Sequence, residues 1–184
     1  MTLHAGENEY GAGWSGDAVA SGVRREIRDG RPLVLGIGNT LLGDDGAGVR
    51  LVERLRSDLG ADAATFIDGG TIGFALLSYV EATGSMLVVD AADLDSSPGT
   101  LGLFEGVAMD RFLVSRRRRT VHEVGLIDLL DMARLQDCLP IRRALLCIQP
   151  ARIDWRGSLS APVEAAFAGA VERARALLER WRVR

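Results

Sequence analysis

The amino-acid sequence predicts a single α/β domain of three layers, in which a mostly parallel, twisted sheet of about five strands carries helices on both faces. Two observations predict this class. Short apolar runs of strand length alternate along the chain with amphipathic segments of helical period. The first run, residues 33–38, holds only apolar residues and Gly, which is typical of a parallel strand buried on both faces. A chain of 184 residues is long enough for one such domain with its own core.

Strands are expected where a short apolar run is bounded on at least one side by a nearby Gly, Pro or Asp, because these residues interrupt regular structure. The runs with this pattern are 33–38, 63–67, 85–89, 100–104 and 144–148. Helices are expected where apolar residues recur every three or four positions. The segments with this spacing are 49–59, 72–82, 124–133 and 163–181. The last of them has the most regular apolar stripe, which we expect to face the core rather than a partner.

The first 30 residues differ in composition from the rest of the chain. They are rich in Gly, Ser, Asp and Glu and show no sustained hydrophobic period. We therefore expect a flexible N-terminal extension over 1–30, to which we assign no function, followed by one α/β domain over 31–184.

Composition and charge exclude several classes of protein. The chain carries 22 basic and 25 acidic residues, a net charge of −3, whereas nucleic-acid binders usually have a basic surplus. No apolar run is long enough for a membrane span, and no basic and apolar leader is present. Cys138 and Cys147 lack the spacing of a zinc site and are expected to be core thiols in a reducing compartment. We expect a cytoplasmic protein that binds neither nucleic acid nor membrane.

The glycine-rich loop after the first run does not fit a nucleotide site. Gly36 and Gly38 invite a dinucleotide-binding interpretation, but the third glycine of that fingerprint falls on Leu41. Asp44 and Asp45 would repel a pyrophosphate. Both precede the first predicted helix, where carboxylates favour the free amides and the positive end of the helix dipole. We predict no cofactor-binding site in this loop, only a tight exit from the strand.

Acidic residues and one histidine gather at one predicted edge of the sheet. Asp68 and Asp90 end predicted strands, Asp45 follows another strand end, and His122 precedes a predicted helix. The carboxyl ends of parallel strands border the crevice in which ligands bind. Each acid alone is compatible with a helix cap, and His122 with a surface histidine. If His122 faces this edge, two carboxylates and one imidazole make an open site for a borderline divalent metal.

Several segments, in order, resemble the motifs of the hydrogenase maturation endopeptidases. The resemblance covers roughly residues 33–180, and the ordered set is far more specific than any one motif. The segments are 36–49 (GIGNTLLGDDGAGV), 68–73 (DGGTIG), 87–91 (LVVDA) with 98–100 (PGT), 121–126 (VHEVGL) and 147–150 (CIQP).

The resemblance implies a specific activity. Members of this family are endopeptidases, often classed as aspartic-type, that remove a C-terminal extension from a [NiFe] hydrogenase large-subunit precursor after nickel insertion and so activate it. The resemblance implies that Asp45, Asp90 and His122 contact the nickel and act as both metal ligands and catalytic residues. The nickel is expected from the substrate's own centre, although another divalent metal can occupy such a site in isolation. Asp68 and Asn39 match family motifs with less defined roles.

The residues leave several alternatives open. Water is activated either by the metal or by an aspartate acting as general base. A non-catalytic maturation chaperone would bind the nickel-loaded large subunit without cutting it, and a small-molecule-binding protein would respond to nucleotides instead. Arginines 116–119 are expected to form a solvated loop, with a basic docking lip as the alternative.

Overall fold

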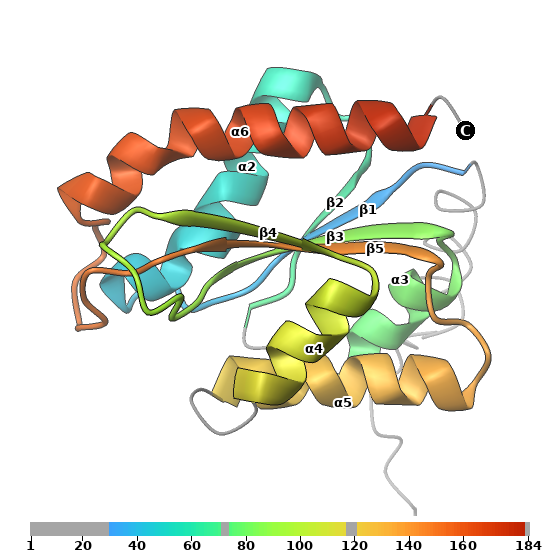
Figure 1. Ribbon diagram of the computed structural model, residues 1–184. Helices are drawn as coiled ribbons and strands as arrows, with labels where there is room; N and C mark the ends of the chain where they lie inside the picture. Colours follow the sequence, from blue (N-terminus) through green and yellow to red (C-terminus); the bar gives the residue numbers. More distant parts are fainter. Residues whose placement is uncertain (1–29, 71–73, 117–120, 183–184) are drawn as a thin grey trace, which may run out of the picture.

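The computed structural model describes residues 30–70, 74–116 and 121–182, although not the side chains of residues 74 and 121–124. Apart from its last residue, the expected N-terminal extension lies outside these ranges. The described residues form a three-layer α/β fold, with one sheet between two layers of helices (Figure 1). The predicted fold class is confirmed.

The sheet has the order β2-β1-β3-β5-β4. Neighbouring strands are parallel except for β4, which pairs antiparallel with β5 at one edge. The three inner strands, β1, β3 and β5, are buried on both faces for most of their length. The strands are β1 (Leu33–Gly36), β2 (Thr65–Asp68), β3 (Ser85–Ala91), β4 (Leu101–Glu105) and β5 (Arg142–Ile148). Each predicted strand is confirmed, with both ends within two residues of the expected positions.

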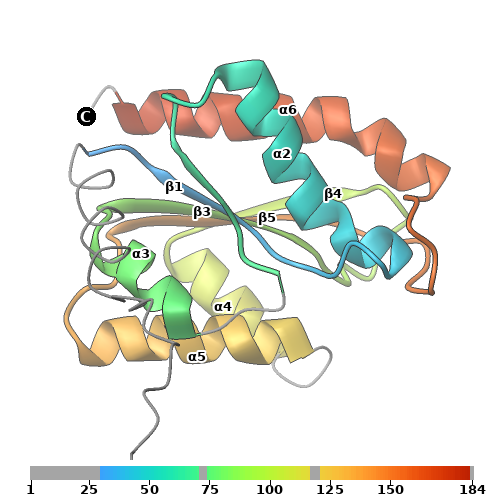
Figure 2. The ribbon, with the colours of Figure 1, turned by 180° about the vertical axis from the view of Figure 1, so that it is seen from behind.

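Two layers of helices cover the sheet, as the opposite views in Figures 1 and 2 show. One face packs against α2 (Ala47–Leu59) and α6 (Ala161–Arg182), and the other against α3 (Leu77–Glu81), α4 (Val107–Arg116) and α5 (Val121–Leu135). Two short 3-10 helices, η1 (Gly43–Gly46) and η2 (Phe74–Leu76), precede α2 and α3. The apolar stripe of α6 faces the core as predicted, because Val163, Val171 and Leu178 are buried there. No helix in the described ranges is long and apolar enough to cross a membrane.

The helices differ from the sequence prediction in three places. The helix α4 was not predicted, because only Met109 and Leu113 of its apolar residues are buried and the others do not form a stripe. The helix predicted over 72–82 is reduced, within the described residues, to η2 and the five-residue α3. The helix α5 begins at Val121, so His122 lies in its first turn rather than before it.

Close backbone contacts explain the glycines of the first loop. A Cβ on Gly48 would lie 2.3 Å from the carbonyl oxygens of both Ile37 and Val89. A Cβ on Gly38, whose φ is +127°, would lie 1.9 Å from the carbonyl oxygen of Asp45. These glycines therefore let α2 and η1 approach the ends of β1 and β3 at backbone contact distance, which agrees with the predicted tight strand exit.

Replacing Gly48 with Ala should destabilise the fold. The added methyl group meets two backbone oxygens, one just past the end of β1 and one in β3, and overpacking of this kind costs about 1–3 kcal/mol. Urea unfolding should show a lower midpoint for Gly48→Ala. The matched control is Gly84→Ala, since a Cβ there would have no atom within 4 Å and Gly84 has no positive φ. Equal midpoints for the two variants would contradict this account.

Candidate active site

Backbone hydrogen bonds join the carboxyl ends of β1, β2 and β3 into one edge. The amide of Ile37 donates to the carbonyl oxygen of Val89 at 2.9 Å. The amide of Gly69 donates to the carbonyl oxygen of Gly36, and that of Gly38 to Gly70, both at 2.8 Å. The pairing of these strands thus continues beyond their ends. The segments that carry Asp45, Asp68 and Asp90 therefore meet at the same edge, as predicted.

Asp45 lies in η1, which packs against β3. Its side chain is 6% exposed, and its Oδ2 accepts a hydrogen bond from the amide of Asn39 at 2.8 Å. The side chain of Asn39 in turn accepts from the amide of Leu41 at 3.0 Å, which closes a tight turn. Asn39 thus shapes the loop and holds the Asp45 carboxylate, a positioning role that the sequence motif alone did not define.

Asp90, the penultimate residue of β3, is 3% exposed. Side chains alternate between the two faces of a strand. Because Met86 and Val88 pack in the core on the α4 and α5 side, Asp90 belongs to that same side. Cys147 of β5 is its partner in register and packs in the same core. Asp90 therefore sits at the end of the central strand, on the face that α5 covers.

Asp68 is at the same edge but on the other face. Phe66 packs on the α2 and α6 side of the sheet. Asp68 is two residues further along β2 and therefore belongs to the same face. The Asp68 side chain is exposed, and its Oδ1 accepts from the amide of Gly70 at 2.8 Å. The contact closes the turn after β2. The structure therefore separates Asp68 from Asp90 and gives it a local structural role.

His122 is the second residue of α5. In both ribbon views α5 begins at the end of the molecule toward which β1, β3 and β5 run (Figures 1 and 2). The side chain of His122 is outside the described part of the structure. Among the residues whose side chains are described, no three potential ligands lie close enough to hold a metal. The complete set of Asp45, Asp90 and His122 thus stays a prediction.

Asp44 has a role that sequence reasoning missed. We predicted that it would favour the helix start, but no side chain caps η1 or α2, and the Asp44 carboxylate is fully buried against the segment before α6. Its Oδ2 accepts from the amides of Ala151 and Arg152 and from the hydroxyl of Ser160, at 2.7–3.1 Å, and its Oδ1 accepts from the amide of Ser160. Burial alone would raise the pKa of Asp44, but these donors outweigh it, and the pKa lies below its ordinary value. The partners are more than 100 residues away, so no local pattern revealed them.

Arg116 also differs from the prediction of a solvated loop. It ends α4, and its side chain is only 13% exposed. Its guanidinium lies 2.7 Å from Asp95 and 3.4 Å from Asp93, in the loop that follows β3. It also stacks over the ring of Phe112. Arg116 therefore joins the end of α4 to the loop after Asp90, while arginines 117–119 lie outside the described residues.

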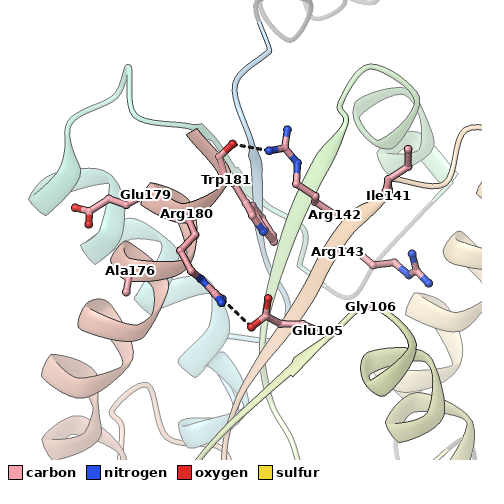
Figure 3. A pocket seen from close by; sticks show the side chains of 9 residues that line it. All are labelled: Glu105, Gly106, Ile141, Arg142, Arg143, Ala176, Glu179, Arg180 and Trp181. Carbon is pink, nitrogen blue, oxygen red and sulfur yellow. Dashed lines mark hydrogen bonds and ion pairs between the residues drawn. The ribbon is translucent and has the colours of Figure 1, made fainter. Parts of the chain in front are cut away.

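A cavity of about 720 Å³ lies at the opposite end of the sheet, between the start of β5, the end of β4 and the end of α6 (Figure 3). The arginines that line it interact with other residues of the protein. Arg180 pairs with Glu105, Arg143 pairs with Asp110, and Arg142 donates to the carbonyl oxygen of Trp181. The cavity shares no residue with the edge that carries Asp45 and Asp90, and it has no place in the predicted chemistry.

The fold and its edge define a three-layer α/β protein with two nearly buried candidate site carboxylates, Asp45 in η1 and Asp90 near the end of β3. Known proteins share both sequence and fold with it. The sequence model of the hydrogenase maturation proteases matches residues 49–176. The hydrogenase expression/formation protein HoxM of Cupriavidus necator is 36% identical over 151 residues, which cover 81% of this chain and 74% of HoxM. The hydrogenase 2 maturation protease of Escherichia coli is 31% identical over 150 residues, 80% of this chain and 90% of its own.

Solved structures agree with these relatives. The hydrogenase maturating endopeptidase HybD of Escherichia coli superimposes with a TM-score of 0.74 at 29% identity, over 82% of this chain and 93% of its own. The [NiFe] hydrogenase maturation protease HybD of Thermococcus kodakarensis superimposes with a TM-score of 0.68 at 27% identity. The match covers 80% of this chain and 99% of that protein. The chain belongs to the hydrogenase maturation protease family, and it is therefore a peptidase. This assignment favours the peptidase over the chaperone and the small-molecule-binding alternatives.

Replacing Asp44 with Asn should destabilise the protein in a pH-dependent way. Hydrogen bonds to a charged group contribute about 1.5–3 kcal/mol each, and Asn places an NH2 group against at least one of the donors. We expect a loss of at least about 2 kcal/mol near pH 7. Because the folded pKa is depressed, the charge of Asp44 stabilises the fold above the unfolded pKa of about 3.9 and loses this effect as the pH falls through the lower folded pKa.

The measurement is the difference in unfolding free energy between wild type and Asp44→Asn, taken by urea titration from pH 7 down to pH 3. The difference should be constant near neutral pH and shrink below about pH 4. Asp68→Asn is the control, because that carboxylate is exposed and should show a much smaller difference. A penalty for Asp44→Asn that does not change with pH would contradict the assigned role of its charge.

Proposed function

We propose that the chain is an endopeptidase that removes the C-terminal extension of a [NiFe] hydrogenase large-subunit precursor after nickel insertion. Its family membership supports a peptidase in hydrogenase maturation. The observation that supports the proposal further is that Asp45 and Asp90 are both nearly buried, and that the 3-10 helix with Asp45 packs against the strand with Asp90. The helix that carries His122 begins at the same end of the molecule. Together these three residues offer the substrate's nickel two carboxylates and one imidazole.

The chemistry of this set fits a metal that the substrate brings with it. Oxygen and imidazole ligands suit borderline divalent ions such as nickel, and three ligands leave positions open for the groups that already hold the ion. Asp45 has one oxygen engaged by the amide of Asn39, which fixes its orientation before substrate arrives. Once bound, the nickel would anchor the precursor so that its tail lies across the carboxyl edge of the sheet.

Cleavage of the tail requires an activated water molecule. Nickel would polarise the scissile carbonyl or lower the pKa of water, whereas a carboxylate that takes the proton from water would make the enzyme aspartic-type. The two roles separate in Asp→Asn variants of residues 45 and 90. A variant that still binds the nickel-loaded precursor but does not cut it identifies a general base. A variant that no longer binds it identifies a ligand.

We also propose that the reaction takes place in the cytoplasm. The support is that the chain has only two cysteines, Cys138 half-buried and Cys147 buried, which are too few for a disulfide framework. This use of cysteine is typical of proteins that stay in a reducing compartment.

Single replacements of the three proposed ligands should stop processing while the protein stays folded. Loss of groups that only orient a ligand costs about 10- to 100-fold in affinity or activity, so loss of a ligand should cost at least 100-fold. Asp45→Asn, Asp90→Asn and His122→Gln are assayed on purified, nickel-loaded precursor, with the shortened subunit detected by mass spectrometry. Asp68→Asn is the matched control and should keep most of the activity. Normal processing by one of the three variants would remove that residue from the site.

Processing should depend on nickel in the substrate rather than on metal supplied to the peptidase. Two carboxylates and one imidazole, without thiolate, make a modest and open site, so metal added alone should not replace the substrate's centre. A precursor that lacks nickel should stay uncut even with excess divalent metal in the reaction. Efficient cleavage of this precursor would overturn the proposed recognition, and a stable complex of loaded precursor without shortening would indicate a chaperone.

A further inference from the structure

Large apolar side chains are exposed beside the carboxyl edge of the sheet. Trp155 is 81% exposed, Leu41 61% and Ile153 52%. We call these three residues the apolar rim. Exposed single hydrophobics are ordinary on a protein surface, but a Trp exposed to this extent and near two further exposed apolar residues is typical of an interaction site.

The rim is mounted on a loop that the protein holds in place. The segment 151–157 is bound to the first loop of the chain, since the amide of Gly43 donates to the carbonyl oxygen of Arg156 at 2.7 Å. The buried carboxylate of Asp44 accepts from the amides at the start of this segment. Arg50 of α2 donates to the carbonyl oxygen of Gly157 at 2.6 Å. The backbone that presents Trp155 is thus fixed before any partner arrives, which lowers the entropic cost of binding.

The rim is continuous with the candidate active site. Leu41 follows Asn39 by two residues, and the amide of Asn39 binds the carboxylate of Asp45. The segment 151–157 packs against Gly43 and Asp44, which directly precede Asp45. Both ribbon views show the loop before α6 beside the start of α2 (Figures 1 and 2). A macromolecule that delivers a peptide to Asp45 and Asp90 would therefore meet the rim.

The charges of the loop are paired with one another. Asp154 lies 3.2 Å from Arg156 and 3.8 Å from Arg152. One acid offsets one of the two arginines, so the segment 151–157 keeps a single net positive charge, and exposed charges of this kind contribute little. The contribution of the rim is therefore apolar contact rather than electrostatic attraction.

We propose that the apolar rim docks an apolar surface on the folded body of the hydrogenase large-subunit precursor, next to the tail that is removed. This inference rests on the proposed function, because it takes the precursor as the occupant. Docking on the rim would hold the body of the substrate while the edge of the sheet acts on its tail. Trp155 is the central contact of this surface and does not take part in the cleavage step.

The test compares Trp155→Ala with wild type on nickel-loaded precursor. A Trp at the centre of an interface dominates its affinity, so KM and the Kd of the complex should rise about 10- to 30-fold while kcat stays within about twofold. Trp155→Phe should recover much of the affinity because an aromatic ring remains. The matched control is Ile141→Ala, since Ile141 is 89% exposed but lines the cavity at the other end of the sheet. Unchanged KM and Kd for Trp155→Ala, or an equal change for Ile141→Ala, would overturn the proposal.

Two further results keep the inference separate from the proposed function. If wild type does not shorten the precursor at all, the proposed function fails, and the Kd of the complex for wild type and Trp155→Ala still tests the rim. Sedimentation velocity of the peptidase alone tests the other occupant, a second copy of this chain. We expect the wild type and Trp155→Ala to sediment with the same oligomeric state. A dimer that Trp155→Ala dissociates would assign the rim to self-association and overturn the proposal.

Discussion

The burial of the Asp44 carboxylate organises the functional end of this molecule. One ionised side chain, removed from water, accepts hydrogen bonds from three backbone amides and one hydroxyl of the segment before α6. An isolated buried charge is strongly unfavourable, so the fold is compatible with Asp44 only when that segment is in place. The neighbouring residue, Asp45, is thereby held at the edge of the sheet. A structural acid and a candidate catalytic acid are thus adjacent in the chain, and their environments separate the roles.

The glycines of the first loop also help to position Asp45 at this edge of the sheet. Gly38 and Gly48 allow η1 and α2 to touch the carbonyl oxygens at the ends of β1 and β3, at distances that any side chain would prevent. The loop resembles a nucleotide-binding turn in its position and glycine content, and its glycines serve close contact between backbone segments. The same contacts bring η1, which carries Asp45, toward the central strand β3, whose penultimate residue is Asp90. The close packing of this loop thus also determines where Asp45 lies.

Much of the fold could be predicted from the sequence, because the signals were local. The strand β3 is a continuous apolar run ending at Asp90, and α6 has a regular stripe, so both were found. The positions of Asp45, Asp68 and Asp90 at one edge followed from the strand ends. What the sequence did not reveal depends on contacts between distant segments. Asp44 meets Ser160 116 positions away, Arg116 meets Asp93 and Asp95, and α4 buries too few side chains to leave a pattern. The alternation of side chains between the two faces of β2 and β3, rather than any motif, places Asp68 and Asp90 on opposite faces of the sheet.

The order of the strands also has a consequence for how the chain is made. The neighbour of β4 in the sheet is β5, which lies between β4 and β3 although it follows both in sequence. During synthesis, β4 leaves the ribosome some forty residues before the strand it pairs with. The donors that neutralise Asp44 emerge later still. A nascent chain therefore carries an unpaired strand and an unsatisfied acid until about residue 160 has been translated, and the edge that holds Asp45 can form only then. The C-terminal third of the chain is therefore needed to complete the fold. A copy truncated before about residue 160 would not form the edge that holds Asp45.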